Sequence, residues 1–135
     1  MIFIDTTIWV SAIDASDGLH RDGKAVLEAL VKGNISSAMT TDFVLDEALT
    51  ILKKRGARID VIAEIVENIL SSELVRVIFV DEPVFRDALS NFEKYEKLSF
   101  TDSVTLTSMN HYKTREIFSH DKDFNLKGII RKERP

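Results

Sequence analysis

Short apolar runs alternate with segments of helical periodicity along this chain, and the alternation limits the folds that it can adopt. No uninterrupted apolar run exceeds four residues, the longest being Met1–Ile4 and Val77–Val80. Runs of this length that stop at polar residues are typical of strands buried on both faces of a parallel sheet. A membrane-spanning helix needs about 20 apolar residues, so we expect none in this chain.

The same pattern predicts the order of the elements. We expect strands at Met1–Ile4, Ile35–Thr40, Val75–Val80 and Glu116–Ser119. We expect helices around Ile8–Ile13 and over His20–Lys32, Asp42–Lys54, Ile59–Leu70, Pro83–Tyr95 and Ser99–His111, with Gly33 as a C-cap. Strands that alternate with helices form parallel β-α units, which predicts a three-layer α/β/α sandwich around a parallel sheet. At 135 residues, the chain has the size of a single domain spanning 1–135.

The charge balance is acidic, with 22 acidic and 18 basic residues and a net charge of -4 at pH 7. This balance argues against a protein that binds nucleic acid mainly by neutralising phosphates, and it suits one whose acids hold metal ions. The absence of cysteine excludes disulfides, thiolate zinc sites and cysteine nucleophiles. Because the N-terminus lacks a basic start followed by a long apolar stretch, we expect no secretory signal and a cytoplasmic protein.

Basic residues gather in two places. One group is Lys53, Lys54, Arg55 and Arg58, and the other is Lys127, Arg131, Lys132 and Arg134. We interpret both groups as solvated surface, and the second as part of a frayed C-terminal tail.

Acidic residues follow the first and last expected strands. Asp5 comes directly after Met1–Ile4, and Asp121 follows Glu116–Ser119 closely. Ligands of open α/β sheets bind outside the carboxyl ends of the strands, so these two acids point to a site on one rim. Asp81 also follows a strand, but Glu82 and Pro83 after it indicate an ordinary helix start, and we interpret Asp81 as structural.

The helix expected over Asp42–Lys54 contributes another candidate. At about 100° per residue, Asp46 faces away from the apolar stripe of this helix, whereas Glu47 lies at the border of the stripe. Glu47 is therefore the better candidate ligand and Asp46 the better solvated charge. Asp102 sits in the first turn of a later helix, where a carboxylate is also favoured by the helix dipole.

Together these carboxylates suggest a metal site. Four carboxylates on separate elements repel one another unless a divalent cation offsets their charge. Oxygen ligands in this number suit Mg²⁺ or Mn²⁺ and not zinc.

Four segments carry a resemblance to a known family: Ile2–Thr6, Val44–Leu49, Leu98–Ser103 and Ile117–Phe124. In these segments the sequence resembles PIN domains, in particular the VapC-like toxin ribonucleases. The segments occur in the order and spacing of the family, and the resemblance covers essentially the whole chain. It implies a Rossmann-like sheet, an acidic pocket that holds Mg²⁺ or Mn²⁺, and hydrolysis of phosphodiester bonds in RNA.

Residue by residue, the resemblance implies a set of metal-binding acids: Asp5, Glu47, Asp102 and Asp121, with Asp123 as an accessory. Asp121 is favoured over Asp123 as the direct ligand because it is nearer the strand end. Thr6 and Ser119 match small hydroxyl positions of the family and are expected to bind substrate. A cognate antitoxin partner and a homodimer are also implied, with the helices of Asp42–Leu70 as the candidate dimer surface.

The implied chemistry requires no side-chain nucleophile, because metal-held water attacks phosphorus. The histidines His20, His111 and His120 are therefore dispensable for it, although His120 lies where it could contact substrate. The sequence departs from the family at two positions, with Thr7 where many members carry Asn and His120 where Asn or a small residue is common. Both departures bear on substrate preference more than on the metal site.

Other readings of the acids remain open. A haloacid-dehalogenase-type phosphatase also begins with an Asp after its first strand, but it needs an acid two residues later, where this chain has Thr7. A receiver domain needs an N-terminal acidic pair and a late strand-end lysine, and the acids here are placed differently. A PIN-fold nuclease that processes RNA without an antitoxin, or a catalytically silent PIN-fold binding module, would carry a similar sequence.

Overall fold

Five parallel strands form one sheet in the computed structural model, which describes residues 1–135. The strands are β1 (Ile2–Ile4), β2 (Ala38–Thr41), β3 (Val75–Ile78), β4 (Glu116–Phe118) and β5 (Ile130–Lys132). Their order across the sheet is β3-β2-β1-β4-β5, and every neighbouring pair is parallel. The first strand of the chain, β1, therefore lies at the centre of the sheet.

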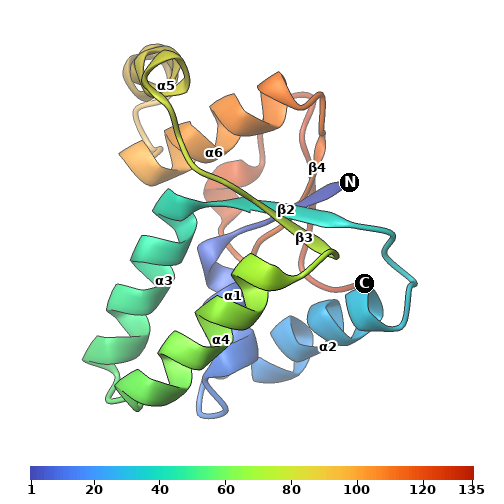
Figure 1. Ribbon diagram of the computed structural model, residues 1–135. Helices are drawn as coiled ribbons and strands as arrows, with labels where there is room; N and C mark the ends of the chain where they lie inside the picture. Colours follow the sequence, from blue (N-terminus) through green and yellow to red (C-terminus); the bar gives the residue numbers. More distant parts are fainter.

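Helices cover both faces of this sheet. They are α1 (Thr6–Ile13), α2 (His20–Val31), α3 (Asp42–Lys54), α4 (Ile59–Ser71), α5 (Glu82–Lys94) and α6 (Phe100–His111), followed by the short 3-10 helix η1 (Lys122–Phe124). In Figure 1, α5 and α6 lie above the strands, and α1 to α4 lie below them. The predicted three-layer α/β/α sandwich with a parallel sheet is confirmed. No helix is both long and apolar enough to cross a bilayer.

The helices begin where capping side chains are available. Thr41 caps α3 by accepting a hydrogen bond from the Val44 amide at 3.2 Å. Asp81 caps α5 by accepting one from the Val84 amide at 3.1 Å, which confirms its structural interpretation. Such caps satisfy amide groups that have no partner inside the helix.

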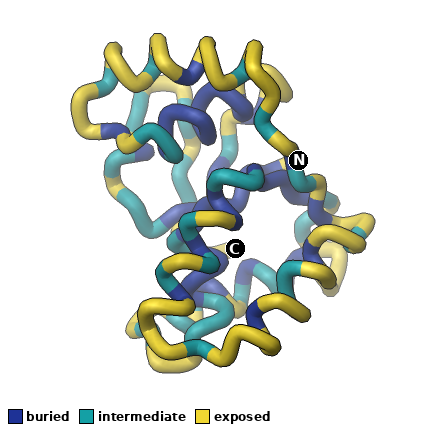
Figure 2. The backbone as a smooth tube through the Cα atoms, turned by 60° about the vertical axis from the view of Figure 1, so that its left-hand side comes forward, coloured by how far each residue is buried: buried dark blue, intermediate teal, exposed yellow.

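The core lies between the sheet and the helices that touch it. All three residues of β1 and all four of β2 are buried. Helix α6 is buried from Asp102 to Met109, because it lies between the sheet and α5, and this explains its weak amphipathic pattern. Figure 2 shows the buried segments in the interior and the exposed turns on the outer helices.

Two strands have bounds that differ from the predicted ones. β2 begins at Ala38 and not at Ile35, because the Ile35 amide bonds to the Ala29 carbonyl and completes the turn after α2. Gly33 has a φ of 78° in this turn, as expected of a C-cap glycine. β3 ends at Ile78, and the next residue, Phe79, is 67% exposed.

The C-terminal segment corrects the sequence analysis. The interpretation of its basic residues as a frayed tail is wrong, since Ile130–Lys132 is the edge strand β5. Arg131 and Lys132 are half-buried, and the Lys132 ammonium lies 2.7 Å from Glu116 of β4. The strand was missed because only one of its three residues is apolar, a pattern common at sheet edges.

Candidate active site

The carboxyl ends of β1 and β4 lie side by side at the centre of the sheet. From β1 the chain continues to β2 on one side, while β4 lies on the other side, so the two strands flank a topological switch point. This is where open α/β sheets bind ligands. The register pairs Ile4 with Phe118, and it therefore places Asp5 next to Ser119.

Asp5 is buried, with 2% of its surface exposed, and it is fixed in place by its neighbours. Its Oδ2 accepts hydrogen bonds from the Ser119 hydroxyl at 2.7 Å, the Thr7 hydroxyl at 3.0 Å and the Thr7 amide at 3.4 Å. All three bonds go to Oδ2. Burial raises the pKa of Asp5 despite these donors, so the folded protein disfavours a bare carboxylate here.

Glu47 and Asp46 lie on different faces of α3. The Glu47 side chain is half-buried, whereas Asp46 is exposed, as the helical periodicity predicts. Burial raises the pKa of Glu47, and the negative charges of Asp102 and Asp121 raise it further, while the nearby hydroxyls of Thr6 and Thr101 oppose the rise. Glu47 therefore lies close enough to the other candidate acids for their charges to act on it.

Asp102 occupies the first turn of α6 and is 8% exposed. Its Oδ2 accepts a hydrogen bond from the Ser99 amide at 3.2 Å, and its own amide donates to the Ser99 hydroxyl at 3.1 Å, which makes a capping box. Burial and then the charge of Asp5 raise the pKa of Asp102 to about 6, with a further contribution from Asp121. The helix-start role and proximity to the other acids thus coexist in one residue.

Asp121 and Asp123 differ in their electrostatic influence on this group. Asp121 caps η1, where its Oδ1 accepts a hydrogen bond from the Asp123 amide at 2.8 Å. The charge of Asp121 acts on both Glu47 and Asp102, whereas Asp123 is not among the main influences on either. This difference supports Asp121 as the inner acid, and the assignment of the direct ligand stays a prediction.

The two hydroxyl residues expected to bind substrate are both buried. Ser119 is fully buried, and its hydroxyl donates to Asp5 while accepting from the Asp121 amide at 3.0 Å. This geometry indicates that Ser119 orients the two acids, and its contact with substrate stays a prediction. Thr6 is 2% exposed, and its Oγ1 has no hydrogen-bond partner, so its approach to Glu47 falls short of a hydrogen bond.

The donor set fits a divalent cation. None of the ion pairs in the structure involves the five candidate acids, so their charge is not offset by any lysine or arginine. No three acidic or histidine side chains converge closely enough to ligate one ion together. Mg²⁺ usually keeps several waters and takes only one or two carboxylates directly, so this spacing suits it. The unpartnered Thr6 hydroxyl would suit one such water.

Sequence reasoning missed the residues that hold the last acidic loop. The Thr7 hydroxyl accepts a hydrogen bond from the His120 amide at 2.9 Å, and thus links α1 to the loop after β4. The Arg131 guanidinium donates to the Ser119 carbonyl at 2.8 Å from β5. No local pattern signals these contacts, because they join residues brought together only by the sheet register.

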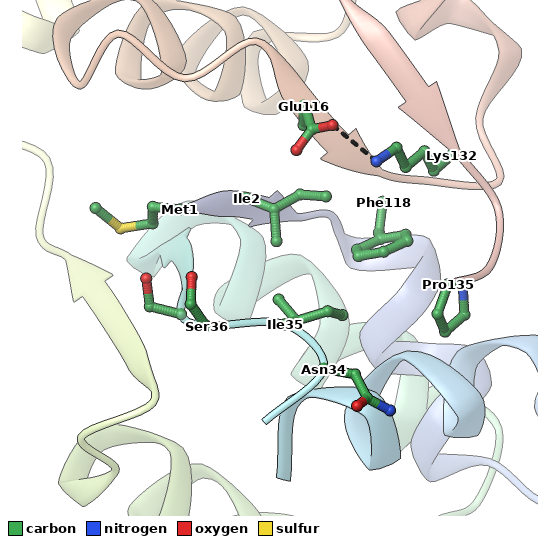
Figure 3. Close-up of a pocket in the computed structure, with 10 residues that line it drawn as sticks. Met1, Ile2, Asn34, Ile35, Ser36, Glu116, Phe118, Lys132 and Pro135 are labelled. Atoms are coloured by element: carbon green, nitrogen blue, oxygen red, sulfur yellow. Dashed lines mark hydrogen bonds and ion pairs between the residues drawn. The ribbon is translucent and has the colours of Figure 1, made fainter. Parts of the chain in front are cut away.

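A cavity of about 330 Å³ lies away from these acids, and it is lined by Met1, Ile2 and Glu116 among others. Figure 3 shows Glu116 and Lys132 above Ile2 and Phe118, with Asn34 and Ile35 below. Its one carboxylate side chain, Glu116, is neutralised by Lys132 at 2.7 Å. A smaller cavity of about 190 Å³ adjoins Thr6, Thr7 and Glu47 instead.

Comparison with known proteins agrees with this geometry. The family model described as "PIN domain" matches residues 2–129. A VapC ribonuclease of Archaeoglobus fulgidus is 31% identical over 131 residues, covering 95% of this chain and 81% of the relative. The 23S rRNA-specific endonuclease VapC20 of Mycobacterium tuberculosis is 28% identical over 133 residues, covering 96% of each protein.

Solved structures share the fold. The crystal structure of Mycobacterium tuberculosis VapC20, described as a sarcin-ricin loop cleaving toxin, has a TM-score of 0.82 and 25% identity, covering 96% of this chain and 97% of that chain. A toxin–antitoxin complex from Klebsiella pneumoniae has a TM-score of 0.67 at 14% identity and covers 96% of both chains, a likeness of fold alone. The family match over nearly the whole chain and the acids at the switch point agree: the chain belongs to the PIN domain family, among relatives named VapC ribonucleases.

Proposed function

We propose that this protein is a VapC-type ribonuclease that hydrolyses phosphodiester bonds of RNA with Mg²⁺ or Mn²⁺, and that residues 1–135 form one nuclease domain acting in the cytoplasm. The observation that carries the proposal is the group of Asp5, Glu47 and Asp102 at the switch point, each with a raised pKa and none with a cationic partner. Grouping carboxylates in this way is costly unless a bound cation offsets their repulsion. The ribonuclease names of the relatives support RNA as the substrate.

The metal, when bound, supplies an activated water and stabilises charge on the attacking and leaving oxygens. We propose that Asp5, Glu47, Asp102 and Asp121 hold it, one or two of them directly and the others through its bound waters, with Asp123 as an accessory. Ser119 and Thr7 keep the Asp5 carboxylate in one orientation, and the capping box keeps Asp102 in its own. Fixed ligands of this kind need no reorganisation during the reaction, and this is the main contribution of a preorganised site.

A cleavage assay tests the proposal. Labelled single-stranded RNA is incubated with the protein in Mn²⁺, in Mg²⁺ and in excess EDTA. We expect cleavage with either metal, none with EDTA, and none by the Asp102→Asn variant, which removes a charge but can keep the helix cap. Full cleavage in excess chelator would contradict the metal-dependent mechanism.

We also propose two protein partners, a cognate antitoxin and a second copy of the chain. The description of a relative as a toxin supports the first. For the second, the surface of α3 and α4 is the candidate, since α4 exposes Ile59, Val61 and Leu70. Light scattering of the purified protein and of Val61→Lys tests the dimer. A monomer in the wild type, or an unchanged dimer in the variant, would remove this surface from consideration.

A further inference from the structure

A small cavity opens beside the acidic group, and its lining differs from that of the metal site. It has a volume of about 190 Å³ and shares Thr6, Thr7 and Glu47 with the candidate site. Beyond them it is lined by Val10, Asp17, Leu19, Ile51, Arg55 and His120. An RNA strand bound across the acids would therefore have one of its nucleotides next to this cavity.

One wall of the cavity is a single face of α3, continued by its C-cap residue Arg55. Glu47, Ile51 and Arg55 follow one another at intervals of four residues, so the wall changes from carboxylate to apolar surface to guanidinium. Val10 of α1 and Leu19 add further apolar surface. A ligand part that fits here has flat apolar faces and polar edges.

Arg55 is held in a fixed position by two acids. Its Nη1 donates to Asp14 at 3.0 Å and to Asp17 at 2.7 Å, and its side chain is 45% exposed. These two carboxylates offset its positive charge, and Glu47 adds another negative charge to the cavity. A phosphate group would therefore be repelled, whereas the face of a fixed guanidinium is a surface on which an RNA base can stack.

His120 is also oriented, and the hydrogen-bond pattern assigns its donor. The Ser11 hydroxyl donates to the Ile8 carbonyl at 3.1 Å, so its single proton is already used. His120 Nε2, at 3.3 Å from the Ser11 oxygen, must therefore donate to it. The other ring nitrogen, Nδ1, has no partner within the protein and can form a hydrogen bond with a base edge.

Gly23 allows this arrangement. A Cβ atom at position 23 would overlap Ser11 Oγ and lie 2.6 Å from the Ala12 nitrogen, so a side chain there would displace α2 or Ser11. The close approach of α2 to α1 thus leaves Ser11 in place to hold the His120 ring. Glycine has poor helix propensity, yet it occupies this position inside α2.

From these contacts we propose that the cavity is a nucleobase subsite, which takes one unstacked RNA base next to the scissile phosphate, stacked near Arg55 and contacted at its edge by His120. Single-stranded RNA is commonly recognised through bases splayed out in this way. The proposal deepens the ribonuclease function above and rests on it. It concerns substrate recognition and leaves the metal chemistry to the acids.

The first test uses RNA oligonucleotides in which one nucleotide at a time around the mapped cleavage site is made abasic. With wild-type protein, the abasic change at one flanking position should lower kcat/KM by about tenfold or more. His120→Ala and Arg55→Lys should each cleave intact and abasic RNA with much more similar kcat/KM. The matched controls His111→Ala and Arg58→Lys alter exposed residues of the same types outside the cavity, and they should discriminate as wild type does.

Two outcomes would overturn the subsite. One is an equal effect of each abasic position in wild type and His120→Ala. The other is a uniform loss of kcat in His120→Ala on every substrate, which would mean that His120 only supports the acidic loop.

A binding measurement separates failure of the subsite from failure of the ribonuclease function. RNA containing 2-aminopurine is titrated with the Asp102→Asn variant, and the fluorescence of the probe reports whether its base is unstacked and bound. We expect a position-specific change that disappears in Asp102→Asn/His120→Ala. If no cleavage is ever seen but this change occurs, the subsite stands and the nuclease proposal fails; if cleavage occurs and the change does not, the subsite is wrong.

Discussion

Carboxylates lie at both ends of the sheet, but the acid at the start of β4 has a cationic partner, whereas the acids of the candidate site have none. At the amino end, Glu116 of β4 lies 2.7 Å from the Lys132 ammonium, and both side chains are more than 40% exposed. At the carboxyl end, Asp5 and Asp102 are buried and Glu47 is half-buried, and none of them is ion-paired. The Glu116–Lys132 contact is thus an ordinary exposed ion pair, which contributes about 0–1 kcal/mol to the free energy of unfolding.

The absence of a cationic partner for buried acids indicates a functional site even where no ligand is bound. Unpaired buried charges destabilise a fold, and burial at the carboxyl end raises the pKa of each acid there. A fold that retains such a group gains nothing from it in stability without a cation. We therefore propose that the carboxyl end is the functional end, and the following variants test this comparison.

The largest effect is expected on α3. Glu47→Gln should lower the RNA cleavage rate by about 100-fold or more, as loss of a key electrostatic group commonly does. Asp46→Asn, at the exposed neighbouring position, should change it by about twofold at most, as surface substitutions usually do. Steady-state cleavage rates at saturating Mn²⁺ check both variants. Equal losses would mean that the inner face of α3 has been misassigned.

The next effect is a reversal of stability. Asp5→Asn removes one charge from the group and keeps an oxygen that can accept from Ser119 and Thr7, so without metal it should melt at a higher temperature than wild type. In Mn²⁺ the ranking should reverse, because wild type gains about 2.7 kcal/mol at a hundredfold excess over Kd and the variant gains much less. Thermal melts in EDTA and in Mn²⁺ provide the comparison. A variant that is less stable in EDTA and responds to Mn²⁺ like wild type would make Asp5 a purely structural residue.

A smaller effect is expected from pH. The folded pKa of Asp102, about 6, lies above its ordinary value of 3.8, so its contribution to stability is complete below pH 3.8 and is lost as pH rises through 6. Metal-free wild type should lose on the order of 2 kcal/mol over this range relative to Asp102→Asn, since one pKa unit is about 1.4 kcal/mol. Urea unfolding of both proteins from pH 4 to pH 7 gives the difference. A constant difference across this range would contradict the raised pKa.

The sequence predicted the fold well where local signals were strong. Helix α3 has the predicted bounds Asp42–Lys54, because a Thr cap precedes it, lysines end it and its apolar stripe is regular. β5 was missed because Ile130–Lys132 has too little apolar character to signal a strand, and its pairing with β4 creates it.

The candidate site was likewise predictable only where local patterns signalled it. The positions of Asp5 and Asp121 after strands, and the phase of Glu47 on its helix, follow from local patterns. The contacts of Thr7 with His120 and of Ser119 with Asp5 do not, since each joins residues more than 100 positions apart through the β1–β4 register. Sequence therefore predicts which acids gather, and only the fold shows what holds them.

Calorimetric titration of metal-free protein with Mn²⁺ tests most directly whether the carboxyl end is the metal site. Wild type and Glu116→Gln should bind Mn²⁺ with the same affinity, because Glu116 lies at the other end of the sheet. Asp102→Asn should bind at least about tenfold more weakly, the scale of loss seen when ligand surroundings are altered. Unchanged binding by Asp102→Asn, or a loss confined to Glu116→Gln, would contradict the account.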